Sequence, residues 1–237
     1  MTDRTAACIV GVLFITATVA STVAIVLLEP VLGAADYLTR ASLSEGLVAT
    51  GALFELINHI AVVGIAVAVY PILRRFSERL ALGYVAARSI EAVFFAIGTM
   101  QLLALVTVSQ EYVAAGAPAT SHLQTLGGIL LAGHDWDRLA LAFTAFGLGA
   151  LVLNYTLYQA RLVPRWLSVW GALAAALIVA ARMAVLYGLE TSSATMAVLD
   201  GPIAVQEMVF AVWLIVKGFS PSAIEPAPTG DVQAAPR

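Results

Sequence analysis

The sequence predicts an all-α integral membrane protein, a bundle of about six transmembrane helices with both termini in the cytoplasm. Of its 237 residues, 61% are hydrophobic and only 11% are charged, whereas soluble domains carry about 25% charged residues. Six apolar stretches approach or exceed the roughly 20 residues that cross a hydrocarbon core. The arginines are unevenly shared between the loops that join these stretches. So much apolar surface cannot be buried inside a soluble domain of this length.

The apolar stretches define the expected membrane spans. They cover residues 6–28, 47–73, 82–108, 139–157, 166–187 and 202–216. No long soluble segment interrupts the series, so we expect a single transmembrane domain over residues 1–219. Residues 220–237 are rich in proline, alanine and acidic side chains without a core-forming pattern, which predicts a disordered cytoplasmic tail.

The first stretch could also be a signal peptide. It exceeds the 7–15 apolar residues of such a peptide, and a single basic residue, Arg4, precedes it, so we interpret it as an uncleaved helix. With the N-terminus inside, only Arg40 and Arg138 among the loop cations lie outside. The cytoplasmic side then carries Arg4, Arg74, Arg75, Arg79, Arg161, Arg165 and Lys217. This excess agrees with the positive-inside rule and with an even number of spans.

The two longer outer segments are too apolar for simple turns. They cover residues 29–45 and 109–137. Within the second, residues 121–132 show a helical apolar pattern that Gly127 and Gly128 interrupt. We expect this piece to lie on the outer surface or to dip into the mouth of the bundle. A cluster of His122, His134, Asp135 and Asp137 follows the same segment; we interpret it as a solvated loop that caps the fourth helix, with a metal site as the alternative.

Several polar side chains lie where lipid surrounds the helices. Burying a charge there costs about 2.5–3.5 kcal/mol on insertion scales, so such residues point inward and are the first place to look for function. Glu55, Asn58 and His59 share one face of the second span because their spacing is i, i+3, i+4. Arg88 and Glu91 share a face of the third span.

The remaining spans add three more polar residues near mid-membrane. They are Asn154, Arg182 and Glu207, from the fourth, fifth and sixth spans. A rise of 1.5 Å per residue places five ionisable residues within one or two helical turns of the midplane: Glu55, His59, Glu91, Arg182 and Glu207. We therefore expect one polar cluster inside the bundle. Arg88 with Glu91 is the expected pair within a helix, and Arg182 with Glu207 or Glu55 the expected pair between helices.

The cluster supports three functions. It can hold the helices together without other activity, because polar contacts between transmembrane helices contribute modestly to packing. It can line a pocket that binds or moves a small, largely apolar molecule, with Asn58, His59, Arg88, Asn154 and Arg182 as its ligand-binding residues. It can also form a proton or ion path. A metal on Glu55 and His59 is a weaker alternative because a second histidine is absent from that helix.

An intramembrane enzyme is the other class of function that these residues allow. A carboxylic acid buried in apolar surroundings can act as a general acid near neutral pH. Glu55, Glu91 and Glu207 are the candidate catalytic residues, with a lipid-like or isoprenoid-like substrate and His59 as proton partner. This reading requires at least two of the carboxylates to line one cavity without a neutralising arginine. The chain has no nucleophile elbow, P-loop or dinucleotide fingerprint.

Four segments resemble a family of bacterial multi-pass membrane proteins, the domain of unknown function 4386. They read YPILRRFSERLALG, AARSIEAVFFAIG, FGLGALVLNYTLYQARLVPRWLSVWG and AVWLIVKGF. The second contains Arg88 and Glu91, and the third contains Pro164 and Arg165 in a short basic turn. The resemblance covers most of residues 5–219. It implies the fold and a membrane location, and it supplies no activity and no catalytic residues.

Composition also limits the partners. The net charge is −3 and the basic residues are not clustered, so we expect no nucleic-acid partner. A single cysteine, Cys8, allows neither an internal disulfide nor a cysteine-based metal cage. We expect no cofactor and no metal, with membrane lipids and a small apolar ligand as partners. Arginine outnumbers lysine eleven to one, a bias typical of GC-rich bacterial genomes, so we expect the bacterial cytoplasmic membrane.

Overall fold

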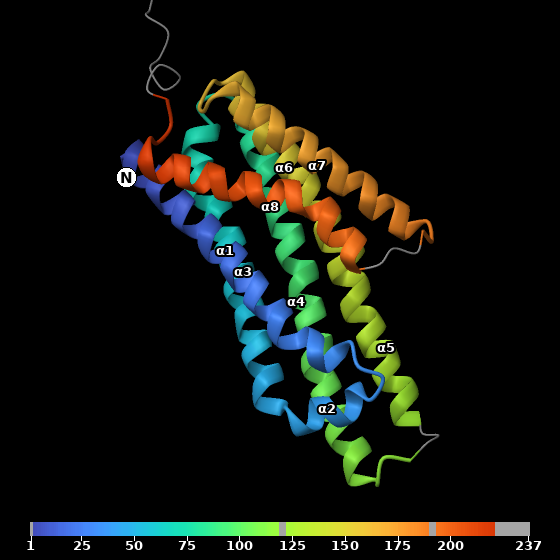
Figure 1. Ribbon diagram of the computed structural model, residues 1–237. Coiled ribbons are helices and arrows are strands. Elements are labelled where there is room, and N and C mark those ends of the chain that lie inside the picture. Colours follow the sequence, from blue (N-terminus) through green and yellow to red (C-terminus); the bar gives the residue numbers. More distant parts are fainter. Residues whose placement is uncertain (1, 119–121, 190–192, 221–237) are drawn as a thin grey trace, which may run out of the picture.

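The computed structural model describes residues 2–118, 122–189 and 193–220, and these residues are almost entirely helical (Figure 1). The long helices are α1 (Asp3–Leu32), α3 (Glu45–Leu73), α4 (Glu78–Ala114), α7 (Arg165–Leu186) and α8 (Ser193–Val216). A short helix, α2 (Tyr37–Leu43), follows α1. The helices α5 (His122–Trp136) and α6 (Phe143–Gln159) are joined by a π-helical turn, η1 (Asp137–Ala142). Within the described ranges there is no strand.

Six of the described helical rods are long and apolar enough to cross a membrane, as predicted. The largest apolar side chains on their outer faces are exposed. Examples are Ile60, Val67, Met100 and Leu173, each at least 61% exposed. Such a surface is stable in lipid, where apolar side chains need no burial. The chain is therefore a multi-pass membrane protein.

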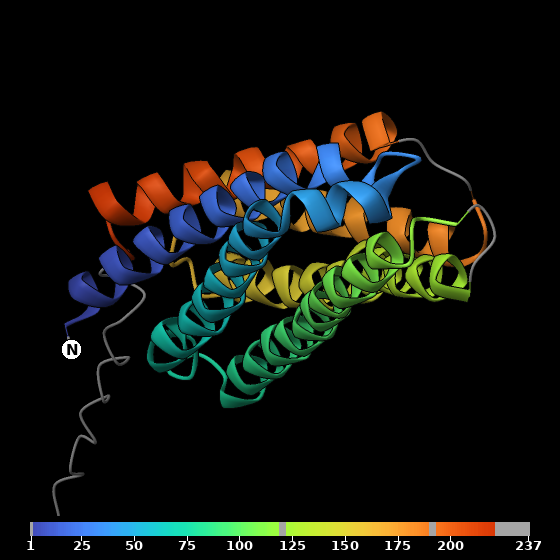
Figure 2. The same ribbon diagram turned by 90° about the horizontal axis from the view of Figure 1, so that it is seen from below.

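The six rods pack as a ring that closes in chain order. α1 contacts α3, α3 contacts α4, α4 contacts α6, α6 contacts α7, α7 contacts α8, and α8 returns to α1. Figure 2, seen from below, shows α8 and α1 side by side although they are the last and first helices of the chain. The neighbours predicted from the two short loops, α3 with α4 and α6 with α7, are confirmed. Side chains that point into the ring are shielded from lipid.

The fourth span is longer than predicted. It runs without a break from His122 to Gln159, whereas the sequence suggested a start at Leu139 and a separate piece before it. The glycine pair does not interrupt the helix. A Cβ atom at Gly127 would lie 2.8 Å from Leu38 Cδ2, so this glycine allows α2 to approach α5 closely. Gly127 is therefore explained by the close contact between α2 and α5 and not by a break in the helix.

The two described ends of the chain lie at the same end of the bundle. The guanidinium of Arg4 donates hydrogen bonds to the carbonyl oxygens of Leu214 and Ile215, at 3.2 and 2.5 Å, and so satisfies the last turn of α8. The backbone N–H of Ser220 donates to the carbonyl of Leu162, in the loop between α6 and α7, at 2.9 Å. An even number of spans follows from this arrangement. The predicted disordered tail lies outside the described residues, apart from Ser220.

The close packing of α1 on α8 depends on Gly11. A Cβ atom at this position would lie 2.7 Å from the backbone oxygen of Ala211, so the helices would have to separate. We expect Gly11→Ala to lower the free energy of unfolding by about 1–3 kcal/mol, measured by thermal unfolding in detergent. Gly46→Ala, where nothing lies within 4 Å, is the matched control and should not be destabilising. Equal stability of the two variants would contradict this packing.

The membrane orientation is tested by labelling single cysteines. In a Cys8→Ala background, Ala35→Cys and Arg79→Cys place exposed thiols at opposite ends of the bundle. With the termini in the cytoplasm, a membrane-impermeant maleimide added to intact cells should label position 35 and not position 79. Labelling of position 79 alone would reverse the orientation.

Candidate functional site

The polar residues predicted to form one cluster lie in three separate places inside the ring. Arg88, Asn154 and Glu207 surround one small cavity, which we call the Arg88 cavity. Glu55, Asn58 and His59 line a second one, the Glu55 cavity. Arg182 lies apart from both, between α7 and α8. The prediction that these residues point inward is confirmed for six of them, which are buried: Asn58, His59, Arg88, Glu91, Asn154 and Arg182. Glu55 and Glu207 are half-buried and line the two cavities.

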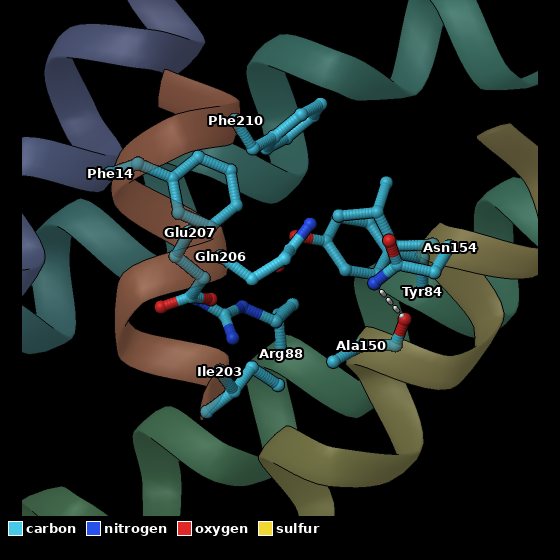
Figure 3. A pocket seen from close by; sticks show the side chains of 10 residues that line it. Phe14, Tyr84, Arg88, Ala150, Asn154, Ile203, Gln206, Glu207 and Phe210 are labelled. Atoms are coloured by element: carbon cyan, nitrogen blue, oxygen red, sulfur yellow. Dashed lines mark hydrogen bonds between the residues drawn. The ribbon is translucent and has the colours of Figure 1, made fainter. Parts of the chain in front are cut away.

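The Arg88 cavity lies between α1, α4, α6 and α8 (Figure 3). Its volume is about 10 Å³, room for about one water molecule. The polar side chains are Tyr84, Arg88, Asn154, Gln206 and Glu207, and the apolar lining comes from Phe14, Ala150, Leu153, Ile203 and Phe210. One part of the wall is therefore apolar and the other can form hydrogen bonds.

Arg88 is held by Glu91, as predicted from their spacing. Arg88 Nη1 lies 3.0 Å from Glu91 Oε2, and both side chains are only 3% exposed. The guanidinium carbon is also 5.3 Å from the ring centroid of Phe146, a favourable cation–π distance. This carboxylate is therefore neutralised within its own helix, and it is not among the residues that line the cavity.

Three buried polar atoms at the Arg88 cavity have no hydrogen-bond partner within the described chain. They are the hydroxyl of Tyr84, Nε of Arg88 and Oδ1 of Asn154. The Asn154 amide nitrogen is occupied, because it donates to the carbonyl of Ala150 at 2.9 Å. Glu207 lines the same cavity, and within the described residues no cation lies within 4.0 Å of its carboxylate. Buried polar atoms are normally paired, so these groups indicate a place for water or a ligand.

The Glu55 cavity lies between α1, α3, α4, η1 and α6 and measures about 30 Å³. Both oxygens of the Glu55 carboxylate are occupied. Thr99 donates its hydroxyl to Oε2 at 2.6 Å, and Nε2 of His134 lies 3.3 Å from Oε1. The other polar side chains in the lining form no hydrogen bond or ion pair within the described chain; they are Ser21, Asn58, His59 and Arg138.

The predicted location of His134 and Asp137 in a solvated loop is wrong. The expected solvated outer loop is helical, and both side chains are buried in it, while Asp135 remains exposed. The continuous rod of α5 and η1 carries His134 to Glu55 of α3. His134 precedes Arg138, which lines the Glu55 cavity, by four residues, and this i, i+4 spacing was the sequence signal for a shared face.

Arg182 pairs with Asp200, not with Glu207 or Glu55 as predicted. Its Nη2 donates to both carboxylate oxygens at 2.5 Å, and Nη1 lies 2.6 Å from the sulfur of Met196. Arg182 is near the end of α7 and Asp200 near the start of α8, so the antiparallel packing brings them level. Glu207 is seven residues further along α8, about 10 Å away along the axis.

Aromatic side chains lie between the three polar groups. Phe95 stacks on His59, with centroids 5.3 Å apart and ring planes 9° apart, and meets Phe143 edge to face at 5.9 Å. Phe143 meets Phe146 in the same way at 5.9 Å. Arg182 lies over Phe143 at 4.6 Å, as Arg88 lies over Phe146. These rings form a packed row that starts at the Glu55 cavity and contacts the buried cations Arg88 and Arg182.

The geometry decides between the chemistries considered above. Within the described residues no group of three or more histidine, cysteine or acidic side chains could hold a metal. Among the described residues each of these two cavities is lined by one carboxylate, Glu207 or Glu55, so neither cavity contains the two acids expected for the enzyme. What the arrangement offers is two small polar cavities, of which the Arg88 cavity has the carboxylate of Glu207 and three polar atoms without a hydrogen-bond partner in the described part of the chain.

The Arg88–Glu91 pair gives a stability test. Removing one partner of a buried ion pair leaves an uncompensated charge and costs about 3–5 kcal/mol. We therefore expect Arg88→Met to destabilise the protein strongly, measured by thermal unfolding in detergent. The double variant Arg88→Met with Glu91→Met should recover most of that loss, because it removes both charges. A double variant as unstable as Arg88→Met would show that the uncompensated charge of Glu91 is not the cause of the instability.

Comparison with known proteins reports the family and nothing further. No curated protein and no solved structure matches the chain. The sequence does match a family described as a domain of unknown function, DUF4386, over residues 9–218. This match spans all six membrane rods and both cavities, and it confirms the resemblance seen in the sequence. The chain is a member of the DUF4386 family of multi-pass membrane proteins.

Proposed function

We propose that this protein binds a small amphiphilic molecule inside the helix ring, at the Arg88 cavity. The observation that carries the proposal is the set of three buried, unpartnered polar atoms on Tyr84, Arg88 and Asn154 around one cavity. Each such atom costs about 1–3 kcal/mol when left without a partner. A ligand with a hydrogen-bonding group would recover that cost.

The residues that line the Arg88 cavity indicate the chemistry of the ligand. Asn154 Oδ1 and the Glu207 carboxylate can accept hydrogen bonds, while the Tyr84 hydroxyl and Arg88 Nε can donate them. Phe14, Ile203 and Phe210 supply an apolar wall. A hydroxyl or amide group attached to an apolar body satisfies both parts of the lining. The proposed ligand is therefore largely apolar with one polar group.

Binding such a molecule requires the cavity to enlarge, because about 10 Å³ holds only a water molecule. Helix α8 is the element that can move. It packs mainly on α1 and α7 but reaches the cavity with the side chains of Gln206 and Glu207 (Figure 3). Pro202 lies inside α8 and removes one backbone hydrogen bond, which makes the helix easier to bend at that point.

The other functions explain less of the geometry. A purely structural role accounts for the pairs Arg88–Glu91 and Arg182–Asp200. It leaves Glu207 and the three unpartnered atoms unexplained. An enzyme with paired carboxylates lacks the second acid in the same cavity. We further place the protein in the bacterial cytoplasmic membrane, supported by the arginine-rich composition and by the basic residues that gather at the end of the bundle where the chain termini lie.

The test is native mass spectrometry of the full chain purified in mild detergent. We expect a small molecule to co-purify with the wild type. Its amount should fall about tenfold or more, equivalent to about 1.4 kcal/mol, in Glu207→Gln and in Asn154→Leu. Glu111→Gln, an exposed site at the far end of α4, is the matched control and should retain the molecule. No bound molecule, or equal amounts in all four proteins, would overturn the proposal.

A further inference from the structure

We propose that Glu55 and His134 form a proton-binding site that exchanges protons with water through Asp135. Glu55 lies on α3 and His134 on α5, 79 residues apart in the chain. The fold brings Oε1 of the carboxylate to 3.3 Å from Nε2 of the imidazole. His134 does not line the Glu55 cavity, and the pair joins two helices, so it is neither part of the cavity lining nor a contact within α3.

The pair needs one proton to be neutral. The side chains of Glu55 and His134 are 12% and 4% exposed, so a bare carboxylate here would lose most of its hydration. Within the described residues, His134 is the only group that can carry positive charge within 4.0 Å of this carboxylate. A carboxylate and an imidazole that share a proton titrate as one unit. In the resting pair the proton is on Nε2 of the imidazole, next to Oε1 of the carboxylate.

The charged groups around the pair favour a bound proton. The helix α5 adds the exposed Asp135, and η1 adds the buried Asp137 and the cation Arg138. From α3, His59 faces the cavity next to Glu55. The neighbouring α4 contributes the uncharged Thr99, and α1 contributes the uncharged Ser21. The acids Glu55, Asp135 and Asp137 outnumber the one arginine, Arg138. The resulting net negative charge favours a proton on the imidazoles.

The imidazole also connects the buried carboxylate to the surface. Its other nitrogen, Nδ1, has no hydrogen-bond partner within the described chain. The nearest acid is Asp135, whose Oδ1 is 3.6 Å away and whose side chain is 56% exposed. This gap is slightly longer than a hydrogen bond, so the exposed carboxyl group of Asp135 is the acid placed to exchange a proton with Nδ1.

Proton transfer then follows in two balanced steps. A proton leaves Asp135, or water bound to it, and forms the Nδ1–H bond of His134. The Nε2–H bond of His134 breaks, and its proton forms an O–H bond with Oε1 of Glu55. The cavity beside Glu55 measures about 30 Å³, enough to hold water, and Phe95 and Phe143 are part of its lining.

This site is separate from the proposed ligand site. It uses α3, α5 and η1, whereas the Arg88 cavity is lined by α1, α4, α6 and α8. A failure of one proposal therefore leaves the other untouched, because the variants that test them share no residue.

The test uses a hydrophobic carbodiimide, which modifies protonated carboxylic acids and spares carboxylates. The full chain in lipid nanodiscs is labelled with dicyclohexylcarbodiimide at neutral pH, and Glu55 is identified by mass spectrometry of its peptide. In the wild type the imidazole carries the proton, so Glu55 should label slowly. In His134→Gln the carboxyl group must carry the proton itself, and labelling should rise about tenfold, equivalent to one unit of proton affinity.

Two further variants keep the outcome decisive. Asp135→Asn changes an exposed side chain and should fold normally; it should raise Glu55 labelling to an intermediate level because the imidazolium loses a stabilising acid. His122→Gln alters an exposed histidine of the same helix and should label like the wild type. Thermal unfolding of each variant in detergent checks that the bundle is intact. Equal labelling of Glu55 in the wild type, His134→Gln and Asp135→Asn would overturn the proposal.

Discussion

The cost of placing a charge in lipid is the constraint on which the rest of this structure depends. Hydrocarbon offers no hydrogen bonds, so a charged side chain in a membrane helix turns inward and finds a partner. Arg88 meets Glu91, Arg182 meets Asp200, and Glu55 meets His134. The last two pairs join different helices, and they fix which face of α3, α5, α7 and α8 points into the ring.

Aromatic side chains complete this arrangement. The ring faces of Phe143 and Phe146 lie next to the guanidinium groups of Arg182 and Arg88, where they provide electrostatic stabilisation without adding charge. The edge-to-face contact between Phe143, which lines the Glu55 cavity, and Phe146, which lies beside Arg88, links the two polar regions. The interior therefore has two polar compartments joined by packed aromatic rings. This division suits a protein that binds different species, a small molecule and a proton, at separate sites.

Unpaired groups distinguish a working site from a structural contact in this protein. Arg182 is fully buried and neutralised by Asp200, which is what a contact that holds two helices together requires. Glu207 faces a cavity where no cation of the described residues lies at ion-pair distance, and atoms of Tyr84 and Asn154 beside it have no hydrogen-bond partner in that part of the chain. Evolution toward stability alone would favour removing such groups. Their presence is the reason for assigning ligand binding to the Arg88 cavity.

The sequence by itself determined the membrane class, the six spans and the inward orientation of the polar residues, because hydropathy and the cost of buried charge act locally along each helix. It also identified the Arg88–Glu91 pair, since a spacing of three residues fixes neighbours on a helix. Only the tertiary structure decided the partner of Arg182, the burial of His134 and the division into two cavities. These depend on the register between helices, which distant packing contacts set, such as Gly127 against Leu38.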